Sequence, residues 1–162
     1  MCIRDSSGFT ALVSGYNDLN VTNVTTFAVN NLVPGSPYYY RVRAYTAAAT
    51  STNSNVITFT TLPASPAAPV AASATSITQF GFTANWSFVS GAIGYRLDVS
   101  TDGTFATFVT GYNNKDVVNV NSYAISGLSS GMPYYYRVRA YNIGGASVSL
   151  SLIHISEPTR PY

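Results

Sequence analysis

One nine-residue string occurs twice in this chain. The string PYYYRVRAY occupies residues 37–45 and again residues 133–141, which sets an offset of 96 between the two copies. The same offset pairs Leu32 with Leu128 without any gap. A fixed internal period of this size indicates one small domain written twice. We therefore interpret the chain as a piece of a tandem array.

Within the repeated string, apolar and polar-tipped side chains alternate. In the second copy the apolar set is Tyr134, Tyr136, Val138 and Ala140, and the polar-tipped set is Tyr135, Arg137, Arg139 and Tyr141. A period of two with aromatic and β-branched residues is typical of a strand with one buried face, because successive side chains leave a strand on opposite sides.

Other short runs of the same kind are separated by turn residues. We expect strands at residues 80–86, 95–99, 105–109 and 123–125, and from 147 onward. The expected inward residues of the first two are Phe80, Phe82, Ala84, Trp86, Tyr95, Leu97 and Val99, with Arg96 and Asp98 outward. No useful length shows a helical pattern. Several short strands with turns between them predict an all-β, antiparallel sandwich or barrel.

The residues before and within the repeated string resemble a known family. Leu128-Ser-Ser-Gly-Met-Pro-Tyr134, followed by Tyr-Tyr-Arg-Val-Arg-Ala140, is similar to the E–F corner and F strand of a fibronectin type III domain. Leu32 to Tyr38 has the same spacing, and Trp86 and Tyr95 match the core residues of strands B and C. The resemblance implies an immunoglobulin-like antiparallel β-sandwich.

The resemblance also implies structural roles for particular side chains. The corner tyrosine of this family buries its ring and bonds its hydroxyl to nearby backbone, which locks the crossover between the sheets. We assign that role to Tyr134, and to Tyr38 in the first copy. Leu128 and Leu32 are the expected core leucines of the same corner.

Neither end of the chain resembles the domain beside it. Residues 1–6 fit one reading frame of a transposase-type sequencing adapter (ATG TGT ATA AGA GAC AG), and residues 150–160 fit the reverse strand with its extension. Our interpretation is that 1–6 and 150–162 are adapter-derived, the alternative being natural termini. Such segments are left out of fold prediction.

The remaining residues divide into two copies. Residues 7–62 align from strand C′ onward, so we expect a truncated copy with strands C′, E, F and G, the last at 56–59. Residues 63–149 are a near-complete copy. The proline-punctuated joint at 61–69 predicts a semi-rigid spacer. By the offset, 56–59 falls on 152–155, so we expect a strand at 151–155 beside the F strand, with 157–162 loose.

Composition excludes several functional classes. Residues 7–149 contain no His, Cys or Glu, one Lys and four Asp. Nucleophile triads, thiol chemistry, zinc sites and paired glutamates are therefore ruled out there, and no cofactor or metal is expected. The net charge of +2 gives no electrostatic case for nucleic acid. No apolar run is long enough for membrane insertion.

Two surface features have more than one interpretation. The segment Asp98 to Gly103 could offer two carboxylates to calcium, but it lacks the other ligands of a calcium loop. The alternative is a hairpin turn in which Asp-Gly supplies a positive φ. The row Tyr135, Arg137, Arg139 and Tyr141 could bind sugar rings or carboxylates. Alternatively it is structural, with Arg stacked on Tyr and paired across strands with Asp98.

The function expected from this sequence is non-catalytic. We expect an extracellular or cell-surface spacer, adhesion or interaction segment of a larger, bacterial protein. Its partners would be other domains of the same chain and an extracellular protein or polysaccharide. The alternative is an accessory region of a secreted polysaccharide-degrading enzyme or protease. Neighbouring genomic sequence would separate the two.

Overall fold

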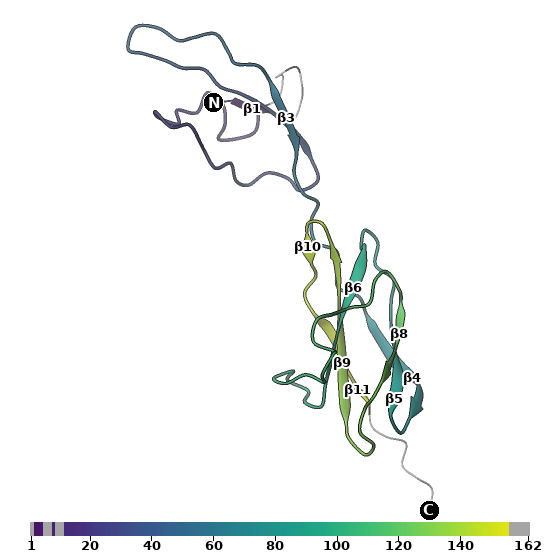
Figure 1. The fold of residues 1–162 in the computed structure, drawn as a ribbon. Coiled ribbons are helices and arrows are strands. Elements are labelled where there is room, and N and C mark those ends of the chain that lie inside the picture. Colours follow the sequence, from purple (N-terminus) through teal and green to yellow (C-terminus); the bar gives the residue numbers. More distant parts are fainter. Residues whose placement is uncertain (1, 5–7, 9–11, 156–162) are drawn as a thin grey trace, which may run out of the picture. The chain divides into compact units, whose positions relative to one another are not determined.

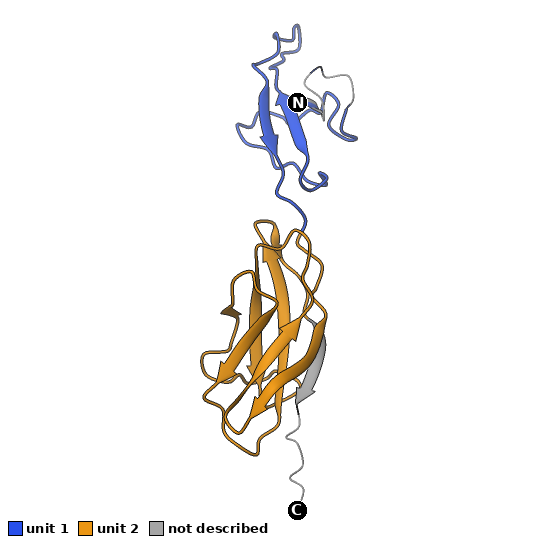
Figure 2. Cartoon of the chain, turned by 90° about the vertical axis from the view of Figure 1, so that its right-hand side faces the viewer, with its two compact units in different colours: residues 1–64 blue, residues 65–162 orange. Residues whose placement is uncertain are grey.

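The computed structural model describes residues 2–4, 8 and 12–155, with strands β1 to β11 and no helix among them (Figure 1). The chain divides into two compact units, residues 1–64 and 65–162 (Figure 2). The expected boundary was between 62 and 63, two residues earlier. All strand pairs are antiparallel, and the predicted all-β class is confirmed.

The second unit consists of two sheets packed face to face (Figure 2). One sheet has the order β4-β5-β8. Its strands are β4 (Ala71–Thr78), β5 (Gly81–Trp86) and β8 (Ser122–Ser126). The other has the order β10-β9-β6-β7, with β11 also paired to β9. Its strands are β6 (Gly94–Ser100), β7 (Lys115–Asp116), β9 (Tyr134–Asn142), β10 (Gly145–Ala146) and β11 (Leu150–Ile155).

The core lies between these two sheets. It contains the alternate residues expected from the sequence, namely Trp86, Tyr95, Leu97, Leu128, Tyr134, Tyr136 and Val138. The Trp86 and Tyr95 rings lie 5.7 Å apart, and the Phe82 and Tyr136 rings lie 5.9 Å apart. Aromatic pairs at these separations add to the area that each ring buries. The immunoglobulin-like sandwich is therefore closed by aromatic contacts between the sheets.

Tyr136 connects the sheets through polar atoms as well. Its ring is fully buried, and its hydroxyl donates to the carbonyls of Ala72 and Asn85 on the opposite sheet. The backbone amide of Asn85 in turn donates to this hydroxyl, at 3.3 Å. Because a buried polar group is costly without partners, these bonds make the position specific for tyrosine.

The corner tyrosines have the geometry expected from the family resemblance. The Ser129 amide donates to the Tyr134 hydroxyl at 2.9 Å, and the Val33 amide donates to the Tyr38 hydroxyl at the same distance. Both rings are buried. Each bond spans the turn that leads into the following strand and so fixes the direction in which that strand enters the sheet.

Two predictions about the strands of the second unit are wrong. Phe80 is 60% exposed, because the chain turns there and β5 begins only at Gly81. Residues 105–109 form a loop, and β7 is the strand that pairs with the free edge of β6. The loop forms because the Asp102 carboxylate accepts hydrogen bonds from the amides of Thr104 and Ala106.

β11 lies where the offset places a last strand. Ile153 is opposite Tyr136 and Ile155 is opposite Tyr134. In the first unit, Ile57 is opposite Tyr40 and Phe59 is opposite Tyr38, which is the same register after a shift of 96. Ladder bonds are made by the backbone, so a β-prone segment of the right length suffices. The predicted loose segment 157–162 lies outside the described residues.

The first unit contains one small sheet. Its order is β1-β2-β3, formed by β1 (Cys2–Arg4), β2 (Pro37–Arg41) and β3 (Ile57–Thr60). Exclusion of residues 1–6 from the fold is therefore wrong for 2–4, because buried Ile3 pairs with Tyr40 as Val99 pairs with Tyr136.

The strands expected at C′ and E of the first unit do not form among its described residues. Residues 27–29 align with β8 but have no strand structure. β8 forms by pairing with β5, and the described part of the first unit contains no equivalent of β5. A lone strand without a ladder partner leaves its backbone groups unpaired and is not stable by itself.

Truncation of the core should destabilise the second unit strongly. Trp86→Ala and Leu128→Ala should each lower the free energy of unfolding by about 2–5 kcal/mol, through lost burial and the cavity left behind. Urea unfolding followed by far-UV circular dichroism measures this. Ile143→Ala, at a residue that is 68% exposed, is the control. Equal effects at buried and exposed sites would contradict the assigned core.

Stability at high pH should depend on Tyr136. Burial raises the pKa of its phenol above the ordinary value of 10.0. The unfolded chain therefore releases this proton at a lower pH than the folded chain does. Its contribution to stability is complete below pH 10 and is lost as the pH rises through the folded pKa. In urea unfolding between pH 9 and 11.5, Tyr136→Phe should flatten the decline. An unchanged slope would contradict this.

Candidate functional site

The outward face of β9 carries the only row of surface side chains that the sequence singled out. We call Tyr135, Arg137, Arg139 and Tyr141 the Tyr/Arg face; all four are half-buried. β9 pairs with β6 so that Asp98 is opposite Arg137 and Arg96 is opposite Arg139. Two strands therefore place one carboxylate and three guanidinium groups on the same side of the sheet.

Asp98 is the centre of this face. The Arg137 Nε donates to its Oδ2 at 2.9 Å, and an Arg139 terminal nitrogen donates to the same oxygen at 3.2 Å. The Asn114 amide donates to Oδ1. The Asp98 side chain is only 1% exposed, although the alternation predicted it to be outward. It points outward from the sheet, but the arginines and the Asn114 segment bury it.

The Tyr141 end of the face is a second cluster. The Arg96 guanidinium lies 4.7 Å from the centre of the Tyr141 ring and 3.3 Å from an Asp116 carboxylate oxygen. The Tyr141 hydroxyl donates to the same carboxylate at 3.0 Å. Burial, followed by this hydrogen bond, raises the pKa of Tyr141. The pKa of Asp116 is lowered, mainly by the hydrogen bond from the Val118 amide.

The opposite end of the face is stacked in the same way. The Arg137 guanidinium lies 4.4 Å from the centre of the Phe105 ring, within cation–π range. Phe105 itself is buried and has a φ of 59° in the loop that follows Asp102. The Tyr/Arg face is thus a flat layer of rings and guanidinium groups that already have partners within the domain.

The corresponding row of the first unit is less complete. It consists of Tyr39, Arg41, Arg43 and Tyr45. Arg43 forms an ion pair with Asp18 at 2.8 Å, as Arg139 hydrogen-bonds Asn114 in the second unit. The position of Asp98, however, is occupied by Cys2 in β1. The two rows are identical in sequence, but only the second has a buried carboxylate beneath it.

The segment from Asp98 to Gly103 has a structural explanation. Asp102 accepts hydrogen bonds from the Thr104 hydroxyl and from the amides of Thr104 and Ala106, and these bonds lower its pKa. The expected positive φ at Gly103 is wrong, because the left-handed residue is Phe105. Within the described residues, no three His, Cys, Asp or Glu side chains converge as metal ligands would.

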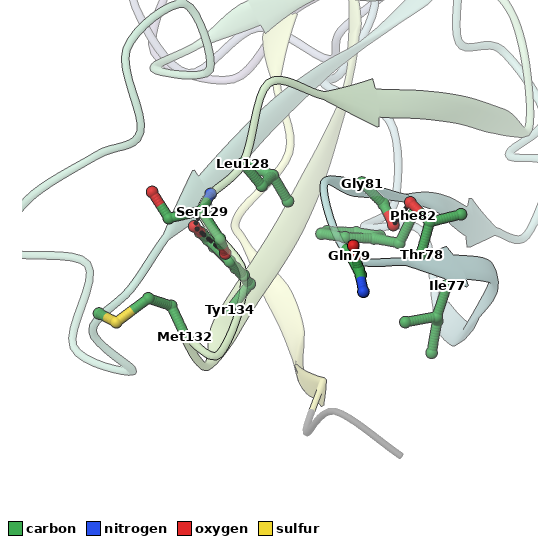
Figure 3. A pocket seen from close by; sticks show the side chains of 9 residues that line it. All are labelled: Ile77, Thr78, Gln79, Gly81, Phe82, Leu128, Ser129, Met132 and Tyr134. Atoms are coloured by element: carbon green, nitrogen blue, oxygen red, sulfur yellow. Dashed lines mark hydrogen bonds between the residues drawn. The ribbon is translucent and has the colours of Figure 1, made fainter. Parts of the chain in front are cut away.

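A small hollow lies at the corner between β4 and the turn before β9 (Figure 3). Ile77, Phe82, Leu128, Met132 and Tyr134 provide most of its apolar lining. Its volume of about 20 Å³ is room for a single water molecule.

The described residues contain no helix that is long and apolar enough to cross a membrane.

The fold and these surfaces define an immunoglobulin-like sandwich domain. The family model described as Fibronectin type III domain matches residues 67–156, more than half of the chain. The chain belongs to the fibronectin type III family, whose domains serve as modules for interaction or spacing. The match continues past residue 149, where the sequence placed the end of the domain.

Among the proteins similar to this chain are two relatives and one solved structure. The "Kelch domain-containing protein SSO1033" of Saccharolobus solfataricus is 30% identical over 159 residues, covering 93% of this chain and 21% of that protein. A "Kelch domain-containing protein" of Sulfurisphaera tokodaii is 31% identical over 136 residues, covering 81% of this chain and 17% of that protein. The chain therefore spans about a fifth of these relatives.

The solved structure is the crystal structure of chicken CNTN1 FN1–FN3 domains. Its TM-score is 0.55 at 18% identity, and the match covers 76% of this chain and 43% of that one. At this identity the likeness shows the fold alone.

The sequence analysis did not identify every residue that contacts the Tyr/Arg face. It named the arginines and Asp98, but it missed Asn114, Asp116 and the role of Arg96 at Tyr141. Asp116 lies in β7 and Asn114 directly precedes it, whereas the sequence analysis expected a strand at 105–109. A signal was present in Asn114-Lys-Asp116, whose polar residues follow the Gly111 turn.

The buried carboxylate should matter more than the exposed one. Asp98→Asn keeps the side-chain shape but removes the charge that Arg137 and Arg139 share, so it should lower the free energy of unfolding by about 1.5–3 kcal/mol. Asp116→Asn, at a site that is 40% exposed, should cause a clearly smaller loss. Thermal and urea unfolding compare the two. A larger loss for Asp116→Asn would contradict the assigned centre.

Proposed function

We propose that the chain is a tandem fibronectin type III segment that acts as a non-catalytic extracellular spacer or interaction module of a larger protein. The observation that carries this proposal is the repetition of hydrogen bonds at the offset of 96. The Ile3 amide donates to the Tyr16 carbonyl, as the Val99 amide donates to that of Tyr112. The Tyr16 hydroxyl donates to the Asn30 carbonyl, as the Tyr112 hydroxyl donates to that of Ser126.

Backbone conformation repeats at the same interval. Asp18 and Asn114 both have a φ of 53°, and Gly15 and Gly111 both have a φ of 83°. Non-glycine residues rarely adopt the left-handed region, so its recurrence at equivalent places is informative. Similarity to the Saccharolobus protein extends over 93% of the chain, beyond residues 67–156. These observations support a truncated first copy in front of the second one.

A spacer role is supported by how each unit holds its own end of the joint. The Thr61 hydroxyl donates to the Val33 carbonyl at 2.7 Å and accepts from the Ser36 amide at 3.0 Å. In the second unit, the Val70 amide donates to the Ser87 hydroxyl at 2.9 Å, and the Ser87 amide donates to the Val70 carbonyl at 2.8 Å. Few residues remain between these attachments, and three prolines restrict the segment further.

The larger protein is proposed from the relatives. Both are Kelch domain-containing proteins of which this chain covers about a fifth. A module of this kind would join or present other domains of the same chain. The sequence on either side in the genome tests this: further repeats and a surface-sorting signal would support the proposal, whereas a hydrolase motif would favour an accessory region of a secreted enzyme.

The second candidate function is polysaccharide binding, and the Tyr/Arg face is the observation that favours it. Flat rings beside half-exposed guanidinium groups are a surface on which a sugar ring can stack. However, Arg96, Arg137 and Arg139 already have carboxylate partners within the domain. This weakens the case for a site built for an external ligand.

Polysaccharide titration of the full chain should therefore give little or no heat in calorimetry. A polysaccharide that binds at the Tyr/Arg face should bind at least tenfold more weakly when Tyr135→Ala is combined with Tyr141→Ala. Tyr39→Ala with Tyr45→Ala is the matched control in the first copy. Binding that survives the second-copy double substitution would exclude this face.

A further inference from the structure

Three asparagines of the chain stand two residues before a serine or a threonine. They begin the triplets Asn20-Val-Thr22, Asn23-Val-Thr25 and Asn85-Trp-Ser87. An asparagine in this position, with any residue except proline in the middle, is the acceptor for N-linked glycans. The three triplets are alike in sequence, so the structure decides which of the asparagine side chains an enzyme can reach.

The first two triplets form one continuous segment, residues 20–25. Both asparagines and both threonines of this segment are exposed. The Asn20 side-chain oxygen accepts from the Thr22 amide at 2.9 Å, which holds the first and last residues of that triplet in one tight turn. Among the described residues, nothing hydrogen-bonds the side-chain nitrogen of Asn20 or Asn23. The atom that would carry a glycan is therefore accessible in both.

The equivalent segment of the second unit is exposed as well, although that unit is a closed sandwich. Residues 116–121 correspond to 20–25, and the counterparts of the asparagines and threonines are all exposed, namely Asp116, Asn119, Val118 and Asn121. The turn is also the same, because the Val118 amide donates to an Asp116 carboxylate oxygen at 3.0 Å. Thr22 and Val118 both have a left-handed backbone, with φ of 57° and 53°. Exposure is therefore a property of this position in the fold.

The third triplet lies in β5, where its side chains already have partners. The Asn85 side-chain nitrogen donates to the Ser73 carbonyl at 3.0 Å. The Ser87 hydroxyl accepts from the Val70 amide at 2.9 Å, and Trp86 between them is only 3% exposed. β5 is paired on one edge with β4 and on the other with β8. An enzyme could reach this asparagine only after β5 had left both ladders.

We propose that residues 20–25 carry an N-linked glycan, with Asn20 and Asn23 as the acceptors, and that folding excludes Asn85. The inference rests on the proposed extracellular role, because such glycans belong to the surfaces of secreted proteins. The donor is a lipid-linked oligosaccharide phosphate. The acceptor Nδ2 forms a bond to C1 of the first sugar, and the C1–O bond to the phosphate breaks. The lipid phosphate leaves with that electron pair, and one Nδ2 proton is lost to solvent.

The test is glycan transfer to the folded full chain by a purified oligosaccharyltransferase supplied with a lipid-linked oligosaccharide. Mass spectrometry locates each glycan, and synthetic peptides of residues 16–29 and 80–91 serve as unfolded references. Asn85 should react at least tenfold more slowly in the folded chain than in its peptide, because β5 has to open first. Residues 20–25 should show no such difference. Thr22→Val with Thr25→Val should abolish transfer there, since it removes both hydroxyls and keeps both asparagines.

The second unit provides a matched pair of variants. Asn121→Thr places a threonine two residues after Asn119, the counterpart of Asn23, and should create a new acceptor at Asn119. Ser122→Thr adds a threonine at the next residue without completing a triplet and should create none.

Four results would overturn the proposal. They are no glycan at residues 20–25 of the folded chain, transfer that persists after both threonines are replaced by valine, reaction of Asn85 in the folded chain as fast as in its peptide, or no new glycan in Asn121→Thr. None of them bears on the spacer role. Genomic neighbours without any export or surface signal would contradict the extracellular role and would leave the acceptor measurements standing.

Discussion

β9 is the strand on which the rest of the second unit depends, because all four of its sides are used. Its two edges pair with β6 and with β10 and β11, which closes the backbone ladder on both sides. Its inner face supplies Tyr134, Tyr136 and Val138 to the core. Its outer face supplies the Tyr/Arg face. Alternation along one strand therefore separates the residues that hold the sandwich together from those that make its surface.

The arginines on the outer side of β9 and β6 are already paired with carboxylates of the same domain. Asp98 organises Arg137 and Arg139, and Asp116 organises Arg96 and Tyr141. Each guanidinium that stabilises the sheet from outside is less free to recognise a ligand, since binding would have to replace interactions already present. This is the physical reason for preferring a spacer or protein-interaction role to a dedicated sugar site.

The first unit illustrates what the same strand does without its partners. β2 repeats the string found in β9, and its neighbours β1 and β3 repeat the pairing of β6 and β11. Val42 nevertheless stays exposed and residues 27–29 do not form a strand, because burial and pairing on that side come from strands that its described residues do not include.

The sequence by itself determined the repeat, the all-β class and the inward residues of β5, β6 and β9, because these follow from local alternation and from a motif with fixed spacing. Only the tertiary structure decided where Asp98 ends up, since its burial depends on arginines and a loop that are distant in the chain. It also decided that residues 105–109 form a loop, because Asp102 accepts hydrogen bonds locally from the amides of Phe105 and Ala106. The tertiary structure also decided that β1 pairs with β2. Ladder bonds are made by backbone groups, so an extended segment at the strand edge can pair although its sequence does not resemble the family.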